Sequence, residues 1–146
     1  MEENYDCLKL ENQLCFPLYA CSKEIVRRYT PLLQEINLTY TQYIVMMVMW
    51  DKQEMNVKAL GERLYLDSGT LTPLLKKLET KKYITRARSK DDERNLVIKI
   101  TKKGMELREK AKNVPIELGK CVNLDEKEAL ALYKTLYKIL DHFKEK

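Results

Sequence analysis

The feature that most constrains the fold lies in the middle of the chain. Two short segments with helical apolar spacing come first, and two segments with the spacing of β-strands follow them. Residues 57–64 and 68–81 each place their leucines on one helical face, and three residues separate them. Asp67 or Ser68 is positioned to cap the second helix, and Pro73 is tolerated because it lies near that helix's start. This order predicts a helix-turn-helix.

A strand pattern follows the second of these helices. Leu96, Ile98 and Ile100 alternate with other residues and give one apolar face. Residues 83–88 are the expected partner strand, and the polar residues 89–94 form the turn between the strands. A helix-turn-helix followed by such a hairpin is a winged helix, so the sequence predicts a mainly α fold with a small β-hairpin wing.

Prolines interrupt the first helical segment. Apolar spacing predicts a helix over about residues 8–28. Pro17 falls inside it, and we expect a kink or irregular turn there because a mid-helix proline loses a hydrogen bond and clashes with the preceding turn. Pro31 should end this helix or open a short one.

Three other helices are expected. Residues 42–50 are apolar nearly all round and should be buried, with Thr39 or Thr41 as the N-terminal cap. Residues 102–118 and 125–143 supply the last two helices.

The final helix carries an apolar stripe that has no obvious partner within a small winged domain. The stripe consists of Leu132, Leu136, Ile139 and Leu140. We expect it to pack, together with the first helix, against a second copy of the chain. The prediction is therefore one domain over residues 1–146, with a winged region over about 40–101 and dimerisation helices over about 8–36 and 102–144.

Composition narrows the chemistry. The chain has 146 residues, 45% of them apolar and 34% charged, as in folded globular proteins. Four cysteines without a C-x-x-C pair and a single histidine do not supply a zinc site. The eight apolar residues 43–50 are too few to cross a bilayer, and the acidic N-terminus lacks a signal pattern. We expect a cytoplasmic protein with four free thiols and no metal, cofactor or membrane partner.

Positive charge is concentrated in one part of the chain. The net charge is +5, yet residues 76–103 hold eleven Lys and Arg against four Asp and Glu, a local net of +7. The remainder of the chain is therefore slightly acidic. A local basic block of this kind indicates a polyanionic partner, most often nucleic acid.

The candidate DNA contacts lie on the helix-turn-helix and the wing. The second helix exposes hydroxyls and lysines that suit the major groove: Ser68, Thr70, Thr72, Lys76 and Lys77. The hairpin adds Arg86, Arg88, Lys90, Asp92 and Arg94. Arg94, near the wing tip, can enter the minor groove, and Asp92 can hold the Arg94 guanidinium in one rotamer through paired hydrogen bonds. We therefore expect double-stranded DNA as the partner.

Five stretches carry a resemblance to a known family. They are residues 8–16 (LKLENQLCF), 18–20 (LYA), 38–43 (LTYTQY), 66–76 (LDSGTLTPLLK) and 91–94 (DDER). Over nearly its whole length the sequence resembles the MarR family of winged-helix repressors, and within it the branch that senses organic hydroperoxides.

The resemblance implies a homodimer that releases its operator when an organic hydroperoxide or a related oxidant oxidises Cys15. It also implies that tyrosines of the partner subunit donate hydrogen bonds to that sulfur. Tyr29 and Tyr40 match this role, and Tyr19 lies nearby. Phenol O–H groups that donate to sulfur favour the thiolate, which is the nucleophile that attacks a peroxide.

The resemblance also bears on the other cysteines. Cys121 stands where the two-cysteine form of this branch has a second thiol, which resolves the sulfenic acid as a disulfide between subunits. Cys7 and Cys21 match no motif position, and we interpret them as structural.

Two other functions stay open at this point. One is a MarR-type repressor released by a small aromatic ligand, with Cys15 not the sensor. The other is a thiol peroxidase, but such an enzyme needs turnover with a reductant, and nothing in the chain resembles a reductase docking site. The sequence therefore predicts a regulator rather than an enzyme.

Overall fold

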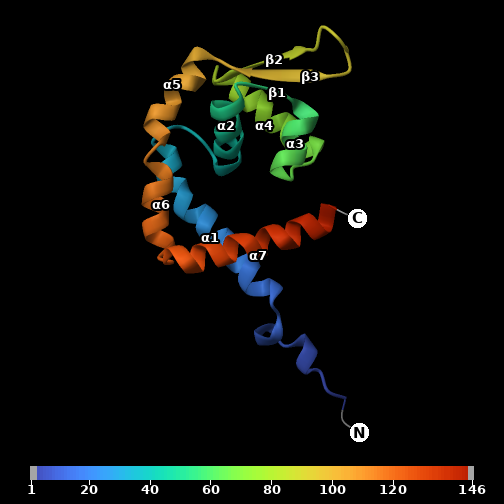
Figure 1. The fold of residues 1–146 in the computed structure, drawn as a ribbon, viewed down its shortest axis with the longest axis vertical. Coiled ribbons are helices and arrows are strands. Elements are labelled where there is room, and N and C mark those ends of the chain that lie inside the picture. The colour runs from blue at the N-terminus through green and yellow to red at the C-terminus, as the bar shows by residue number, and fades with distance from the viewer. Residues whose placement is uncertain (1–2, 145–146) are drawn as a thin grey trace. The chain divides into compact units, whose positions relative to one another are not determined.

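The computed structural model describes residues 3–144 and divides the chain into two compact units, one ending at Val114 and the other starting at Pro115. Figure 1 shows the elements in order along the chain. The α-helices are α1 (Cys15–Gln34), α2 (Tyr40–Lys52), α3 (Val57–Leu64), α4 (Ser68–Thr80), α5 (Lys102–Ala111), α6 (Val114–Val122) and α7 (Glu126–Lys144), and the strands are β1 (Glu54–Asn56), β2 (Ile84–Arg88) and β3 (Leu96–Ile100).

The N-terminal segment differs from the predicted single helix over residues 8–28. Two 3-10 turns, Asp6–Leu8 and Leu10–Asn12, come first, and α1 begins only at Cys15. Pro17 is therefore the third residue of α1, where the backbone N–H groups have no partner within the helix. Its missing N–H costs no helical hydrogen bond, so the expected interruption at Pro17 is wrong.

The end of α1 also differs from the prediction. Pro31 lies inside the helix, which continues to Gln34 instead of ending at the proline. The chain reverses at Asn37, which adopts a left-handed conformation with φ 56°. The Leu33 carbonyl accepts from the backbone N–H groups of Ile36 and Leu38 at 3.1 and 3.0 Å, which closes this turn.

A capping box begins α2. The Thr39 hydroxyl oxygen accepts from the Gln42 backbone N–H at 3.3 Å, and Gln42 Oε1 accepts from the Thr39 backbone N–H at 3.1 Å. Thr39 rather than Thr41 is thus the cap. The helix behind it is buried as predicted, and the fully buried Val45, Met46 and Met49 belong to the core of the first unit.

The helix-turn-helix is confirmed. The Asn56 side chain caps α3 by accepting from the Ala59 N–H at 3.2 Å, and the Asp67 side chain caps α4 by accepting from the Thr70 N–H at 2.7 Å. Pro73 lies inside α4 without ending it. The second helix therefore starts behind one of its two predicted caps, Asp67, whereas the Asn56 cap of the first helix was not predicted.

The wing belongs to a three-stranded antiparallel sheet with the order β1–β3–β2. Its hairpin, β2 with β3, is confirmed, and Figure 1 shows the loop between these strands extending beyond the helices of this unit. The pairing places Arg86 opposite Ile98. The sequence did not predict β1, because its three residues are too few and too polar to show an alternating pattern.

The predicted helix over residues 102–118 is two helices, α5 and α6. The break falls at residues 112–113, just before Pro115. A proline at that position removes a helical hydrogen bond and its ring collides with the carbonyl of residue 111 in a continuous helix. The final helix is confirmed as α7. Within residues 3–144, no helix is long and apolar enough to cross a membrane.

Candidate nucleic-acid interface and redox site

The outer face of α4 presents polar side chains to solvent. All five predicted contacts on this helix are exposed: Ser68, Thr70, Thr72, Lys76 and Lys77. The opposite face is buried through Leu71, Leu74, Leu75 and Leu78. This helix is thus anchored by one face while the other carries hydroxyl and ammonium donors suited to bases and phosphates.

Short-range hydrogen bonds shape the turn at the wing tip. The Arg88 guanidinium donates to the Glu93 carbonyl at 2.8 Å, and the Asp92 carboxylate accepts from the Arg94 backbone N–H at 3.0 Å. Asp92 therefore holds the backbone of Arg94, in place of the expected pairing with its guanidinium. Within the described part of the chain, no carboxylate forms an ion pair with Arg94, which is exposed like Lys90.

Arg86 differs from the other cations of the wing. Its side chain is only 19% exposed, and its Nη2 lies 3.1 Å from Glu79 Oε1 on α4. The guanidinium holds the pKa of the Glu79 carboxyl below its usual range, chiefly through this hydrogen bond. Arg86 is thus already paired inside the protein, which its sequence position did not reveal.

A groove of about 680 Å³ joins the wing to the helix-turn-helix. Arg94 lines it from the wing, Ser68 from the start of α4 and Lys58 from α3. The groove shows that these three elements share one surface. Lys58 was missed by the sequence reasoning, although its place on the polar face of the first helix of the motif is a signal for it.

Three tyrosines form a cluster where α1 meets α2. The ring centroids of Tyr29 and Tyr40 are 4.8 Å apart, and Tyr43 lies 5.7 Å from Tyr29 and 6.4 Å from Tyr40. Burial, with contributions from Tyr40 and Tyr43, raises the pKa of Tyr29 to about 12. A tyrosine keeps its proton near neutral pH even at its ordinary pKa, so the Tyr29 phenol has an O–H that can donate a hydrogen bond.

Cys15 is exposed and is the first residue of α1. Unpaired N–H groups at a helix N-terminus favour a negative charge. Tyr29 lies fourteen residues further along the same helix, which separates the two backbones by about 21 Å. Tyr29, and Tyr40 whose ring lies beside it, therefore do not reach the Cys15 of their own chain. Tyr19 is nearer to Cys15, one helical turn away, and the Tyr19 ring centroid lies 5.2 Å from Lys23 Nζ.

The remaining thiols are also exposed. Cys7 lies in a 3-10 turn, Cys21 on α1 and Cys121 on α6. The structural role expected for Cys7 and Cys21 is not supported by burial, because neither side chain is packed away from solvent. Among residues 3–144, no cluster of His, Cys, Asp and Glu side chains is arranged to hold a metal ion.

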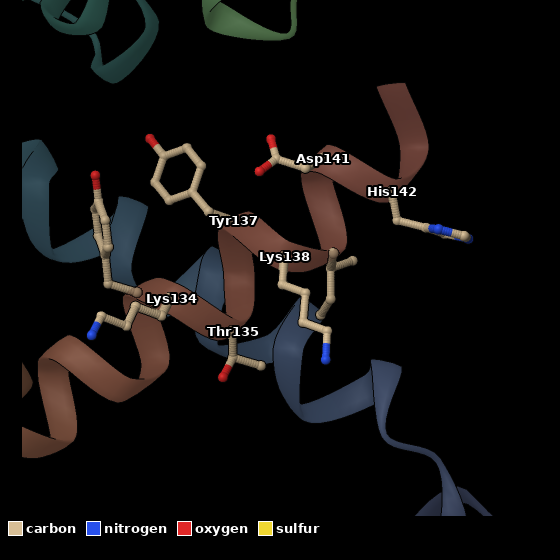
Figure 2. Close-up of a pocket in the computed structure, with 8 residues that line it drawn as sticks. Lys134, Thr135, Tyr137, Lys138, Asp141 and His142 are labelled. Carbon is tan, nitrogen blue, oxygen red and sulfur yellow. The ribbon is translucent and has the colours of Figure 1, made fainter. Parts of the chain in front are cut away.

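The last helix exposes its apolar residues. No residue of α7 is buried, and Leu132, Ile139 and Phe143 are 48%, 37% and 65% exposed. Figure 2 shows Tyr137 and Asp141 projecting from one side of α7. Both residues line a hollow of about 880 Å³ whose lining residues all belong to this helix. A hollow on a single helix is an open face, which fits a surface that packs against another protein better than a closed ligand site.

The polar face of α4, the cationic wing and the groove between them define a winged-helix DNA-binding protein of the regulatory type. Residues 27–111 match the family of SarA/Rot transcriptional regulators, which is more than half of the chain. The chain therefore belongs to this family of transcriptional regulators and has the winged-helix fold of MarR proteins, as the resemblance implied.

Individual relatives agree with this assignment. The chain is 46% identical over 149 residues to the organic hydroperoxide resistance transcriptional regulator of Bacillus subtilis (strain 168), covering 100% of this chain and 99% of that protein. The structure of the present chain resembles that of reduced AbfR bound to DNA, with a TM-score of 0.79 and 31% identity. The match covers 94% of this chain and 98% of the AbfR chain. The disulfide form of AbfR gives a lower TM-score, 0.63, at 31% identity and 97% and 96% coverage.

Proposed function

We propose that the chain is a homodimeric repressor that binds operator DNA while Cys15 is reduced and releases it when an organic hydroperoxide oxidises Cys15. The observation that carries this proposal is the separation of Cys15 from the half-buried tyrosine pair of its own chain. Tyr29 and Tyr40 are hydrogen-bond donors, and Cys15 is an exposed sulfur at a helix N-terminus. In a dimer, the tyrosines of one subunit can donate to the Cys15 sulfur of the other subunit.

The chemistry begins with attack of the Cys15 thiolate on the terminal oxygen of the hydroperoxide. The O–O bond breaks, an S–O bond forms, and the alcohol leaves after taking up a proton. Sulfur is oxidised to the sulfenic acid and the peroxide is reduced. Donation from the phenol groups of the partner subunit supports the thiolate before attack.

The DNA contacts proposed from the geometry are the exposed side chains of α4 and the wing. Ser68, Thr70 and Thr72 face the bases and phosphates of the major groove, and Lys76 and Lys77 neutralise phosphates. Arg88, Lys90 and Arg94 extend this contact from the wing. Because the interaction is largely electrostatic, binding should weaken steeply as salt concentration rises.

The dimer rests on the apolar faces of α1 and α7, whose side chains are exposed in the single chain. Near the start of α1, Leu14 is 82% exposed and Phe16 is 43% exposed. On α7, Tyr133 is 59% exposed. A soluble chain rarely leaves large apolar side chains in such numbers without a partner. A second copy satisfies both helices and also supplies the donors to Cys15.

The proposal makes the chain a cytoplasmic regulator rather than a thiol peroxidase. A sensor consumes about one peroxide per thiol and then stops, whereas a peroxidase turns over with a reductant. Steady-state peroxide consumption in the presence of a dithiol reductant separates the two, and the proposal expects no sustained turnover.

The direct test is Cys15→Ser. Serine keeps the size and hydrogen bonding of the side chain but has no oxidisable sulfur, so the variant should bind DNA like the wild type and stay bound after treatment with cumene hydroperoxide. The measurement is a gel shift on the protein's own upstream region, with Cys21→Ser as the matched control that still releases. Release of Cys15→Ser by peroxide would overturn the proposal, and release by a small aromatic acid alone would favour a ligand-controlled repressor.

A further inference from the structure

We infer that the ion pair between Arg86 and Glu79 fixes the wing against the recognition helix α4, so that Arg86 is a positioning residue for DNA binding and not a DNA contact. The inference deepens the proposed function and rests on it. It changes the role that the position of Arg86 on the wing had suggested.

The geometry places the pair across the junction between helix and wing. Glu79 lies in the last turn of α4, and Arg86 lies on β2, seven residues later. The intervening turn passes through Lys82, which has a left-handed conformation with φ 66°. Arg86 Nη2 reaches back over this turn to Glu79 Oε1 at 3.1 Å.

The ion pair adds a constraint that the backbone alone does not provide. The Lys82 N–H donates to the Glu79 carbonyl at 2.9 Å and the Tyr83 N–H donates to the Leu78 carbonyl at 3.1 Å, which close the end of α4. Beyond that point β2 pairs only with β3, because it is the edge strand of the sheet. The Arg86–Glu79 pair joins this edge strand directly to the helix that reads DNA.

The burial of Arg86 is not that of a DNA contact. Its Nε is buried and has no hydrogen-bond partner among the described residues, and only 19% of its side chain is exposed. Leaving a guanidinium N–H unsatisfied away from water costs free energy. A guanidinium held this way has little surface left for a phosphate, whereas its Nη2 contact with Glu79 Oε1 joins β2 to α4. Lys90 and Arg94, nearer the wing tip, remain exposed for that contact.

The decisive variant is Glu79→Gln, because it separates the two roles of Arg86. If Arg86 contacts DNA directly, removing the carboxylate frees its charge and DNA binding is unchanged or tighter. If the pair positions the wing, Glu79→Gln and Arg86→Met should each weaken binding by about tenfold, and the double variant should bind no worse than either, as expected for a coupled pair. Asp91→Asn removes an exposed wing carboxylate that forms no ion pair with any residue between 3 and 144, so it is the matched control and should not weaken binding.

The experiment uses the full-length reduced protein and a duplex selected from a randomised pool by the wild type, with affinities measured by fluorescence anisotropy across a salt series. Thermal unfolding confirms that each variant is folded, and Glu79→Gln is a near-isosteric change at a side chain that is 40% exposed. A wild type without salt-dependent DNA binding would refute the proposed function itself. A wild type that binds while Glu79→Gln binds equally well would overturn only the positioning role.

A second measurement reports on the wing itself. Arg94→Ala should weaken DNA binding in the wild type, because it removes a cation from the wing tip. In the Glu79→Gln background the wing is no longer held against α4, so the same substitution should have less than half of that effect on a logarithmic scale. Fully additive effects would show that the wing keeps its position without the ion pair, and would overturn the inference.

Discussion

Gly104 and Gly119 both lie within helices, but only Gly119 has room for a side chain. A Cβ at Gly104 would lie 2.2 Å from the Tyr83 carbonyl oxygen and 2.9 Å from Ile100 Cγ1. The backbone at Tyr83 must therefore move, and Gly104→Ala should lower the free energy of unfolding by about 2–3 kcal/mol. Urea denaturation followed by circular dichroism measures this change.

Gly119→Ala is the control for that prediction. No atom lies within 4 Å of a Cβ built at Gly119, and alanine is a better helix former than glycine by about 1 kcal/mol. The substitution should be neutral or stabilising. Equal losses of stability in both variants would show that the close approach at Tyr83 does not explain the requirement for Gly104.

Tyr29 gives a second prediction at the scale of single residues, because its protonated phenol is the donor proposed for the Cys15 thiolate of the partner subunit. Tyr29→Phe removes the O–H and keeps the ring within the cluster. The variant should bind DNA normally while its Cys15 thiol is oxidised roughly tenfold more slowly by cumene hydroperoxide, the loss of about one hydrogen bond to a charged group. The rate of thiol loss under excess peroxide is the measurement.

Tyr19→Phe is the matched comparison, because Tyr19 is exposed and lies on the same helix as Cys15. If Tyr19→Phe slows oxidation and Tyr29→Phe does not, the donor comes from the chain's own α1 and the assignment of the partner's tyrosines is wrong.

At the scale of elements, Lys81 connects the end of α4 to the turn between α1 and α2. Its Nζ donates to the Asn37 carbonyl at 2.7 Å and to Gln42 Oε1 at 2.9 Å. Gln42 is 2% exposed and also belongs to the capping box of α2, so the contact joins the end of α4 to the start of α2. Lys81→Met should lower the free energy of unfolding by about 1–2 kcal/mol through the lost hydrogen bonds.

Lys77→Met, one turn earlier on the exposed face of α4, should change the same quantity by less than about 0.5 kcal/mol. Denaturant midpoints of the two variants, compared at equal protein concentration, test the prediction. A loss in Lys77→Met as large as in Lys81→Met would mean that a general charge effect, and not the contact with Gln42, is responsible.

The elements that the sequence predicted are those encoded by local signals. Asp67 and Thr39 cap their helices because a side-chain oxygen can accept a hydrogen bond from a backbone N–H two or three residues later. Such a bond forms without contacts from distant parts of the chain. The partner of Arg86 could not be predicted in this way, because the sequence shows that a charge exists but not which carboxylate it meets. The break at Pro115 was available from the sequence, since proline disfavours a continuous helix through that position.

At the scale of the whole molecule, the exposed faces of α1 and α7 and the four exposed thiols bear on how two copies interact. We expect a second copy to cover both helices in the reduced, DNA-binding form. Two recognition helices must lie about one duplex turn, roughly 34–36 Å, apart to read successive major grooves. In the proposed dimer, a covalent change that moves α1 or α7 would alter this spacing, so oxidation at Cys15 could affect DNA binding by α4 without contacting that helix.

The resemblance to the two-cysteine form of this branch implies a resolving role for Cys121, which we propose for this chain. A sulfenic acid on Cys15 that condenses with the Cys121 thiol of the partner subunit forms a disulfide and releases water, which protects the sulfur from further oxidation. The two Cα atoms must come within about 7 Å for this bond to form.

Peroxide-treated wild type should therefore run as a covalent dimer on a non-reducing gel and return to monomer with dithiothreitol. Cys15→Ser and Cys121→Ser should abolish that dimer, whereas Cys7→Ser and Cys21→Ser should retain it. A treated wild type that runs only as monomer, or a dimer that depends on Cys7 or Cys21, would contradict this role and leave Cys15 as a sensor without a resolving cysteine.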